Sequence, residues 1–196
     1  MGKDLVVGPG DLSHLKDAIA AHLTRVGVRN NDLEKWLAAE YGETEICCLN
    51  GASVGEFLRH VVRCEGYSDE RTGFAAGENG TSKYRNMPWW DDSVWLPVEF
   101  EPVTLEIDAP FFVGSCVALL RELRDLQDIS QIKLGSAPDR YDDMRADIRK
   151  FYRSIRSGAT FRLTDVDDSV RWVWLALRDG AELAIKQNTV LYGPPA

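Results

Sequence analysis

Long apolar runs are missing from this sequence of 196 residues. A membrane-spanning helix needs a hydrophobic stretch of about 18 or more residues, so the absence of such a stretch excludes a span. Residues 1–9 hold too short an apolar run for a secretory signal peptide. We therefore expect a cytoplasmic protein that has no membrane partner.

Cysteine and histidine are scarce, with four Cys and three His in the whole chain. Cys47 and Cys48 are adjacent, whereas Cys64 and Cys116 fall in helical patterns, which is typical of buried, reduced thiols. A zinc site built from the first three and His60 would lack the usual spacing, because adjacent side chains on a strand point in opposite directions. We expect no bound metal ion and no cofactor.

Positive charge is also under-represented, since 23 Lys and Arg face 31 Asp and Glu, a net charge of -8. The imbalance lies in residues 86–147, which contain 13 acidic and 5 basic side chains. Binding to phosphates requires clustered Lys and Arg, so this composition argues against nucleic acid as a partner. It favours a protein partner with a basic surface, although negative charge also serves solubility.

The apolar fraction of 44% and the charged fraction of 28% are those of a globular protein. We predict one α+β domain over residues 1–196. Residues 1–64 are predicted to be mainly helical, residues 65–92 to form a long irregular loop, and residues 93–196 to form a mixed or antiparallel sheet packed against about three helices.

Hydrophobic periodicity predicts the individual elements. Helices are expected over residues 12–26, 33–37, 54–62, 110–126, 139–155 and 168–179, the last of them ending at Gly180. Strands are expected over residues 45–49, 94–107, 160–163 and, as a pair, 182–192. Pro102 cannot donate a hydrogen bond to a sheet, so we place a bulge or a break in the strand there.

Residues 51–55 form the string G-x-S-x-G, which in hydrolases surrounds a nucleophilic serine. Ser53 would need a histidine as its base, and the histidine that follows on the same helix lies about 10 Å away by helical rise. Only His14 or His22 remain, so a small serine hydrolase is an alternative hypothesis. We favour a capping box, in which Ser53 and Glu56 bond the free N–H groups at the start of a helix.

Three pairs of adjacent carboxylates recur in the chain: Asp91-Asp92, Asp142-Asp143 and Asp167-Asp168. Paired carboxylates bind Mg²⁺ or Ca²⁺ in some proteins, so a divalent-metal or small-ligand protein is a second alternative. The last two pairs fall in the first turn of predicted helices, where negative charge complements the helix dipole. We therefore interpret those two pairs as structural.

The first pair has a different setting, because it follows Trp89 and Trp90 and precedes Trp95. Aromatic anchors beside carboxylates are typical of a surface that binds a basic protein. Trp89, Trp90, Asp91, Asp92 and Trp95 therefore form the predicted partner-binding site, with packing of the indoles on the core as the alternative. With no coherent catalytic set, we predict a non-catalytic acidic binding module, either immunity- or inhibitor-like or regulatory, rather than an enzyme.

Overall fold

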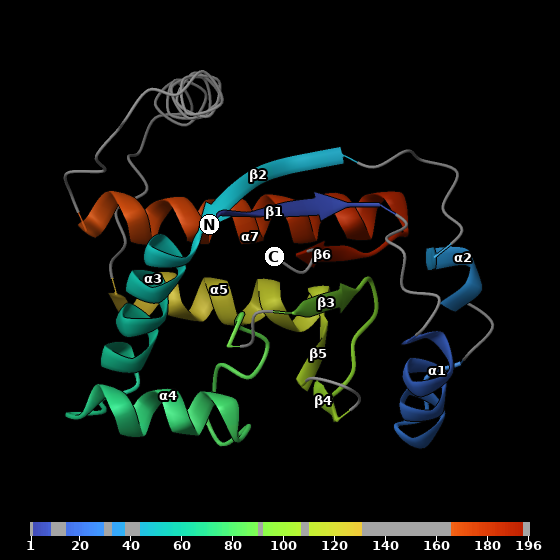
Figure 1. Ribbon diagram of the computed structural model, residues 1–196, viewed down its shortest axis with the longest axis horizontal. Coiled ribbons are helices and arrows are strands. Elements are labelled where there is room, and N and C mark those ends of the chain that lie inside the picture. The colour runs from blue at the N-terminus through green and yellow to red at the C-terminus, as the bar shows by residue number, and fades with distance from the viewer. Residues whose placement is uncertain are drawn as a thin grey trace.

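The computed structural model describes residues 2–8, 15–29, 33–37, 44–89, 92–106, 110–130 and 166–193. In these residues a mixed sheet is combined with helices, so the predicted α+β class is confirmed (Figure 1). The helix predicted over residues 139–155 and the strand predicted over 160–163 lie outside the described residues.

The sheet contains six strands in the order β2-β1-β6-β3-β5-β4. Their bounds are β1 Gly2–Val7, β2 Thr44–Asn50, β3 Ser93–Leu96, β4 Val103–Glu106, β5 Pro110–Ser115 and β6 Leu191–Gly193. Among the pairings of these described strands, β3 with β5 is parallel and the others are antiparallel. β1 was not predicted, because its apolar run is short, yet it lies between β2 and β6.

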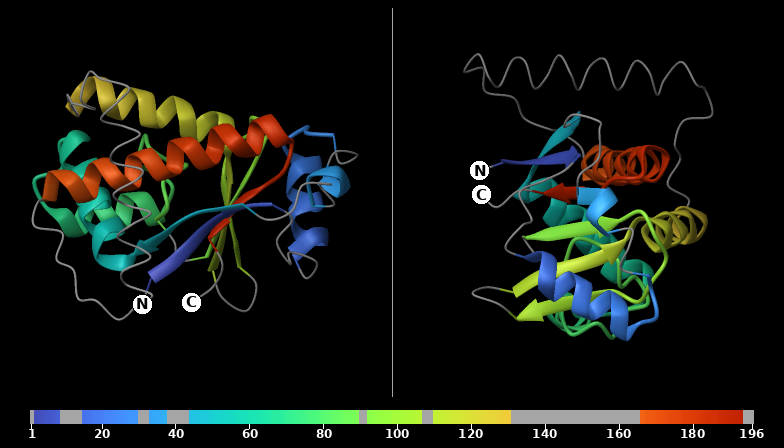
Figure 2. Two further views of the ribbon diagram at one scale, coloured as in Figure 1. Left: turned by 90° about the horizontal axis from the view of Figure 1, so that it is seen from above. Right: turned by 90° about the vertical axis from the view of Figure 1, so that its right-hand side faces the viewer.

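Helices cover both faces of the sheet (Figure 2). The larger core lies beneath α3 Gly51–Cys64, α5 Cys116–Ser130 and α7 Val166–Gln187, and α4 Glu70–Glu78 packs beside α3. The smaller core lies beneath α1 Lys16–Arg25 and α2 Leu33–Leu37. Among the described residues, no helix combines the length and the apolar composition that crossing a membrane requires.

The predicted strand over residues 94–107 is two strands that do not pair with each other, since β5 lies between β3 and β4. The helix predicted from Pro110 begins only at Cys116, and residues 110–115 form β5. Proline is tolerated as the first residue of a strand. The start of α5 is set instead by Ser115, whose Oγ accepts a hydrogen bond from the Ala118 N–H at 3.1 Å, as an N-cap does.

Gly180 does not end α7, which continues to Gln187, so the strand pair predicted over 182–192 is wrong except for its last residues. A Cβ atom at Gly180 would lie 2.7 Å from Cδ1 of Leu191, so glycine lets the helix approach β6 closely. The residue after the helix, Asn188, adopts a left-handed φ of 52°. Its N–H bonds the carbonyl of Ile185 at 3.1 Å.

The predicted irregular loop over residues 65–92 contains helix α4. Asp69 is its N-cap, because its carboxylate accepts hydrogen bonds from the N–H groups of Arg71 and Thr72. Two glycines one turn apart face the core: a Cβ at Gly73 would lie 2.3 Å from the Val62 side chain, and Gly77 lies against an indole ring. The helix therefore packs at a distance that larger residues would not allow.

This close packing is testable at Gly77, where a Cβ would lie 2.2 Å from the ring of Trp89. We expect Gly77→Ala to lower the free energy of unfolding by about 1–3 kcal/mol, because the rigid indole must move. Gly55, in α3, has no atom within 4 Å of its Cβ position. Gly55→Ala should therefore stabilise by about 0.5–1 kcal/mol through helix propensity. Urea unfolding followed by tryptophan fluorescence measures both, and equal stabilisation by the two changes would contradict the packing.

Candidate functional site

The tryptophans of the predicted partner-binding site are part of the core where they are described. Trp89 and Trp95 are 7% and 2% exposed. Asp92 is half-buried, and Trp90 and Asp91 lie outside the described residues. The two described indoles are therefore packed in the core, which is the alternative that the sequence analysis gave for them. Contact with a partner through the carboxylates of this segment stays a prediction.

The buried indoles also fix an irregular segment of backbone, because their N–H groups donate hydrogen bonds to its carbonyl groups. The Nε1–H of Trp89 donates to the carbonyl of Tyr84 at 2.8 Å, and that of Trp95 donates to the carbonyl of Asn86 at 2.7 Å. Phe74 and Phe112 pack against the two rings at centroid distances of 6.1 and 6.0 Å. The indoles thus hold residues 84–86 against α4 and β3.

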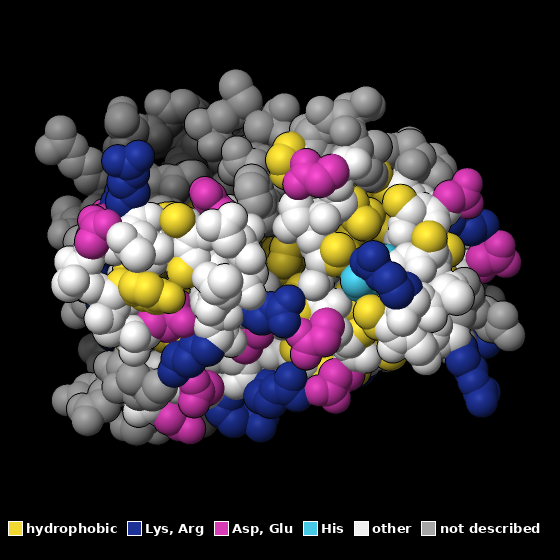
Figure 3. All heavy atoms as spheres, turned by 90° about the horizontal axis from the view of Figure 1, so that it is seen from below, with side chains coloured by type: hydrophobic (Ala, Val, Ile, Leu, Met, Phe, Trp, Pro, Cys, Tyr) yellow, Lys and Arg dark blue, Asp and Glu magenta, His cyan; other side chains and the backbone are white. Residues whose placement is uncertain are grey.

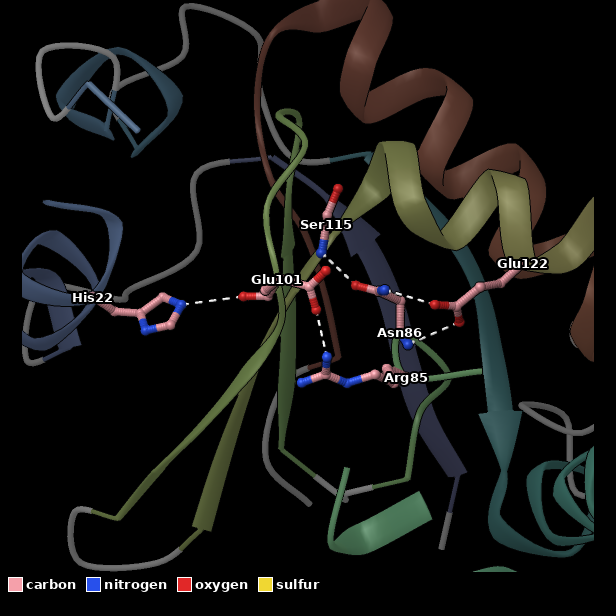
Figure 4. Close-up of polar contacts among 6 residues, drawn as sticks. All are labelled: His22, Arg85, Asn86, Glu101, Ser115 and Glu122. Carbon is pink, nitrogen blue, oxygen red and sulfur yellow. Dashed lines mark hydrogen bonds and ion pairs between the residues drawn. The ribbon is translucent and has the colours of Figure 1, made fainter. Parts of the chain in front are cut away.

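Asn86 is the centre of a buried polar network that sequence reasoning missed (Figure 4). It is 2% exposed. Its backbone N–H and its Nδ2 donate to the two carboxylate oxygens of Glu122 at 2.8 and 2.7 Å. Its Oδ1 accepts from the backbone N–H of Ser115 at 2.9 Å. With the indole of Trp95 on its carbonyl, every polar group of Asn86 has a partner, and the segment is bound to β3, β5 and α5 together.

The carboxyl group of Glu122 is largely buried in this network. Burial raises its pKa to about 7, although the hydrogen bonds from Asn86 and the charge of Arg121 oppose the shift. The two donors facing the carboxyl oxygens stabilise the charged form, but burial has the larger effect on the pKa.

Three exposed carboxylates on the elements around this network are each paired with a cation. Glu99 and Glu101 lie between β3 and β4 and pair with Arg121 and Arg85, respectively, while Asp125 of α5 lies 3.3 Å from Nζ of Lys83. The acidic side chains are 58%, 75% and 53% exposed. The face shown in Figure 3 carries Asp and Glu side chains next to Lys and Arg side chains, and hydrophobic side chains gather around a histidine.

His22 joins α1 to the segment between β3 and β4. Arg25 can only donate, so its bond to Nδ1 of His22 at 2.7 Å makes that atom the acceptor. The proton is therefore on Nε2, which donates to the carbonyl of Glu101 at 3.2 Å. Burial lowers the pKa of His22, and the nearby Arg25 lowers it further. A neutral imidazole thus positions the backbone at Glu101 (Figure 4).

Ser53 does not have the surroundings of a nucleophile, because its side chain is only 3% exposed. The predicted capping box is also misplaced, since α3 already begins at Gly51 and Ser53 lies inside the first turn. Glu56 pairs with Arg59 instead. Nε2 of His60 lies 3.6 Å from Sγ of Cys64, which is one turn further along the same helix.

A metal site has no support in the described part of the chain, where no group of three or more His, Cys, Asp or Glu side chains could hold an ion. The side chains of Cys47 and Cys48 lie outside the described residues, as do those of the acidic pairs at 142–143 and 167–168.

The buried carboxyl of Glu122 predicts a pH dependence of stability. Its pKa of about 7 in the folded protein compares with about 4.3 in an unfolded chain. Between these values the folded protein keeps a proton that the unfolded chain has released, so the contribution of Glu122 falls as the pH rises. Relative to Glu122→Gln, we expect the wild type to lose on the order of 3 kcal/mol of unfolding free energy between about pH 5 and about pH 8.

Urea unfolding across this pH range measures the unfolding free energy of the wild type and of Glu122→Gln. Taking the difference between the two removes the contribution of the other titrating groups, which both proteins share. Glu182→Gln, at an exposed position of α7, is the matched control and should run parallel to the wild type. If the unfolding free energies of Glu122→Gln and the wild type changed in parallel with pH, the raised pKa of Glu122 would be contradicted.

Comparison with known protein families matches residues 90–192 to the family described as "Putative DNA-mimic protein". The described strands of this region, β6, β3, β5 and β4, are consecutive in the sheet, and α5 and α7 belong to the same region. The comparisons with curated proteins and with solved structures gave no match.

This match corrects the functional prediction. A DNA mimic presents negative charge in place of DNA to a DNA-binding protein, so the immunity-like, inhibitor-like module inferred from the sequence is wrong. Such a protein acts by binding, which agrees with the prediction that the chain is not an enzyme and is consistent with a partner that has a basic surface. Because the match covers more than half of the sequence, the chain belongs to the family that carries this description.

Proposed function

We propose that this protein occupies the DNA-binding surface of a DNA-binding protein, with carboxylates in the positions of backbone phosphates. The observation that supports this most is the family match over residues 90–192. DNA-binding surfaces are rich in Lys and Arg that contact phosphates, and those contacts supply much of the affinity without reading sequence. Carboxylates held on a rigid scaffold can form ion pairs with the same Lys and Arg side chains.

The charge within the matched region is concentrated in its first part. Residues 90–130 contain nine Asp and Glu and two Lys and Arg, whereas residues 131–192 contain nine acidic and eleven basic side chains. The acidic part comprises β3, β4, β5 and α5. We therefore place the mimicking surface on these elements and the segment between β3 and β4. Its exposed carboxylates include Glu99, Glu101 and Asp125, each paired with a cation, and also Glu106 and Asp128.

The buried network supports this placement, because it fixes the elements that carry the charges. Asn86 and Glu122 tie α5 to the sheet, and His22 holds the backbone carbonyl of Glu101. Charged groups on a fixed backbone lose less conformational freedom on binding than groups on a mobile loop. The geometry is thus suited to a partner that expects charges at set spacings.

Competition with DNA tests the proposal. Proteins eluted from a DNA column are passed over the immobilised chain, and any retained protein is challenged with a short DNA duplex. We expect the duplex to release it, and the free chain to displace a labelled duplex from it. The variant Glu99→Gln/Glu101→Gln should be a weaker competitor by roughly three- to tenfold, because two charged contacts are lost.

The matched control is Glu34→Gln/Glu182→Gln, which removes the same charge elsewhere. Glu34 is 75% exposed and paired with Lys16, as Glu101 is 75% exposed and paired with Arg85. The control should compete like the wild type. Retained proteins that DNA does not release, or equal loss of competition by both variants, would contradict the proposed surface.

A further inference from the structure

Two cations on the proposed surface come from a part of the chain outside the family match. Lys83 pairs with Asp125, and Arg85 pairs with Glu101. Both carboxylates belong to the matched region, residues 90–192, whereas both cations precede it. Residues 82–86, hereafter the strap, therefore lie against the acidic region and place positive charge among its carboxylates. Figure 4 shows this for Arg85 and Glu101.

The strap is held in a defined conformation rather than resting loosely on the surface. The Ser82 hydroxyl and the Lys83 N–H donate to the carboxylate of Glu65, each at 2.7 Å. The Tyr84 N–H donates to Oγ of Ser82 at 3.0 Å. At the other end, Asn86 bonds Glu122 through two donors. Its two cations are therefore carried on fixed backbone.

The side chain of Lys83 is positioned further by its neighbours. Its Nζ lies 4.5 Å above the centre of the Tyr84 ring and 3.3 Å from Asp125. Arg85 is half-buried, and its guanidinium reaches Glu101 across the space between the strap and the segment before β4. Lys83 and Arg85 thus pair with the same carboxylates, Asp125 and Glu101, that the Lys and Arg side chains of a partner would have to contact.

We propose that the strap is an intramolecular counter-ion, which weakens the acidic surface until a partner's own cations replace Lys83 and Arg85. This inference rests on the proposed function and adds its regulation. Exposed ion pairs are weak and screened by salt, so they can be exchanged when a partner binds. A partner with scattered Lys and Arg side chains gains little binding free energy by replacing Lys83 and Arg85. A partner with a dense basic surface displaces both cations.

The test removes the two cations and measures binding of an oligolysine peptide by calorimetry. In Lys83→Gln/Arg85→Gln the carboxylates of Asp125 and Glu101 lose their counter-ions, so we expect affinity to rise by roughly tenfold at about 0.15 M salt, where the Debye length is about 8 Å. The control, Arg71→Gln/Lys186→Gln, gives the same net charge through two exposed cations elsewhere. It should raise affinity by less than about threefold, since distant charges are screened.

The outcomes separate the two proposals. Equal tightening by both double variants would overturn the strap and leave the proposed function standing, because only total charge would then matter. Weaker binding by the strap variant would also overturn it. Absence of DNA-competitive capture, as measured for the wild type, contradicts the proposed function itself. Unchanged urea unfolding of both variants confirms that the comparison is between folded proteins.

Discussion

The bond between Asn86 and Glu122 is the constraint on which the acidic half of the molecule depends. A buried carboxylate is costly unless donors face it, and here one residue supplies two donors at 2.8 and 2.7 Å. Because Asn86 also bonds Ser115 and Trp95, the same residue fixes the start of α5 and the inner side of β3. The exposed carboxylates are therefore presented from elements that cannot move independently.

Buried tryptophans have a different role here from the partner contact that the sequence suggested. Four described indole N–H groups donate to partners within the protein, those of Trp36, Trp89, Trp95 and Trp174. Three of these acceptors are backbone carbonyls, and the fourth is the side chain of Asn188. An irregular segment has carbonyls that no sheet or helix satisfies, so a buried indole both fills space and bonds one of them. That pairing holds residues 84–86 against the core.

Periodicity predicted the elements that bury one face, such as α1 with Ile19 and Leu23, because an amphipathic stripe is a local signal. It failed where a tertiary contact decided the conformation. Gly180 is inside a helix because Leu191 needs the space, and residues 110–115 form a strand because β3 and β4 flank them. The Asn86 network joins residues up to 36 positions apart, so no pattern of neighbouring residues could have indicated it.

The net charge follows directly from the composition, but it does not identify the function. The function depends on where the charged side chains lie, which the composition does not give. A total of -8 describes a soluble acidic protein as well as a mimic of DNA. What distinguishes the two is whether carboxylates on rigid elements can meet a partner's cations. In this protein each described carboxylate between β3 and β4 already has a cation. On the proposed function, mimicry is an exchange of counter-ions, in which the partner must offer a denser positive surface than the protein's own side chains provide.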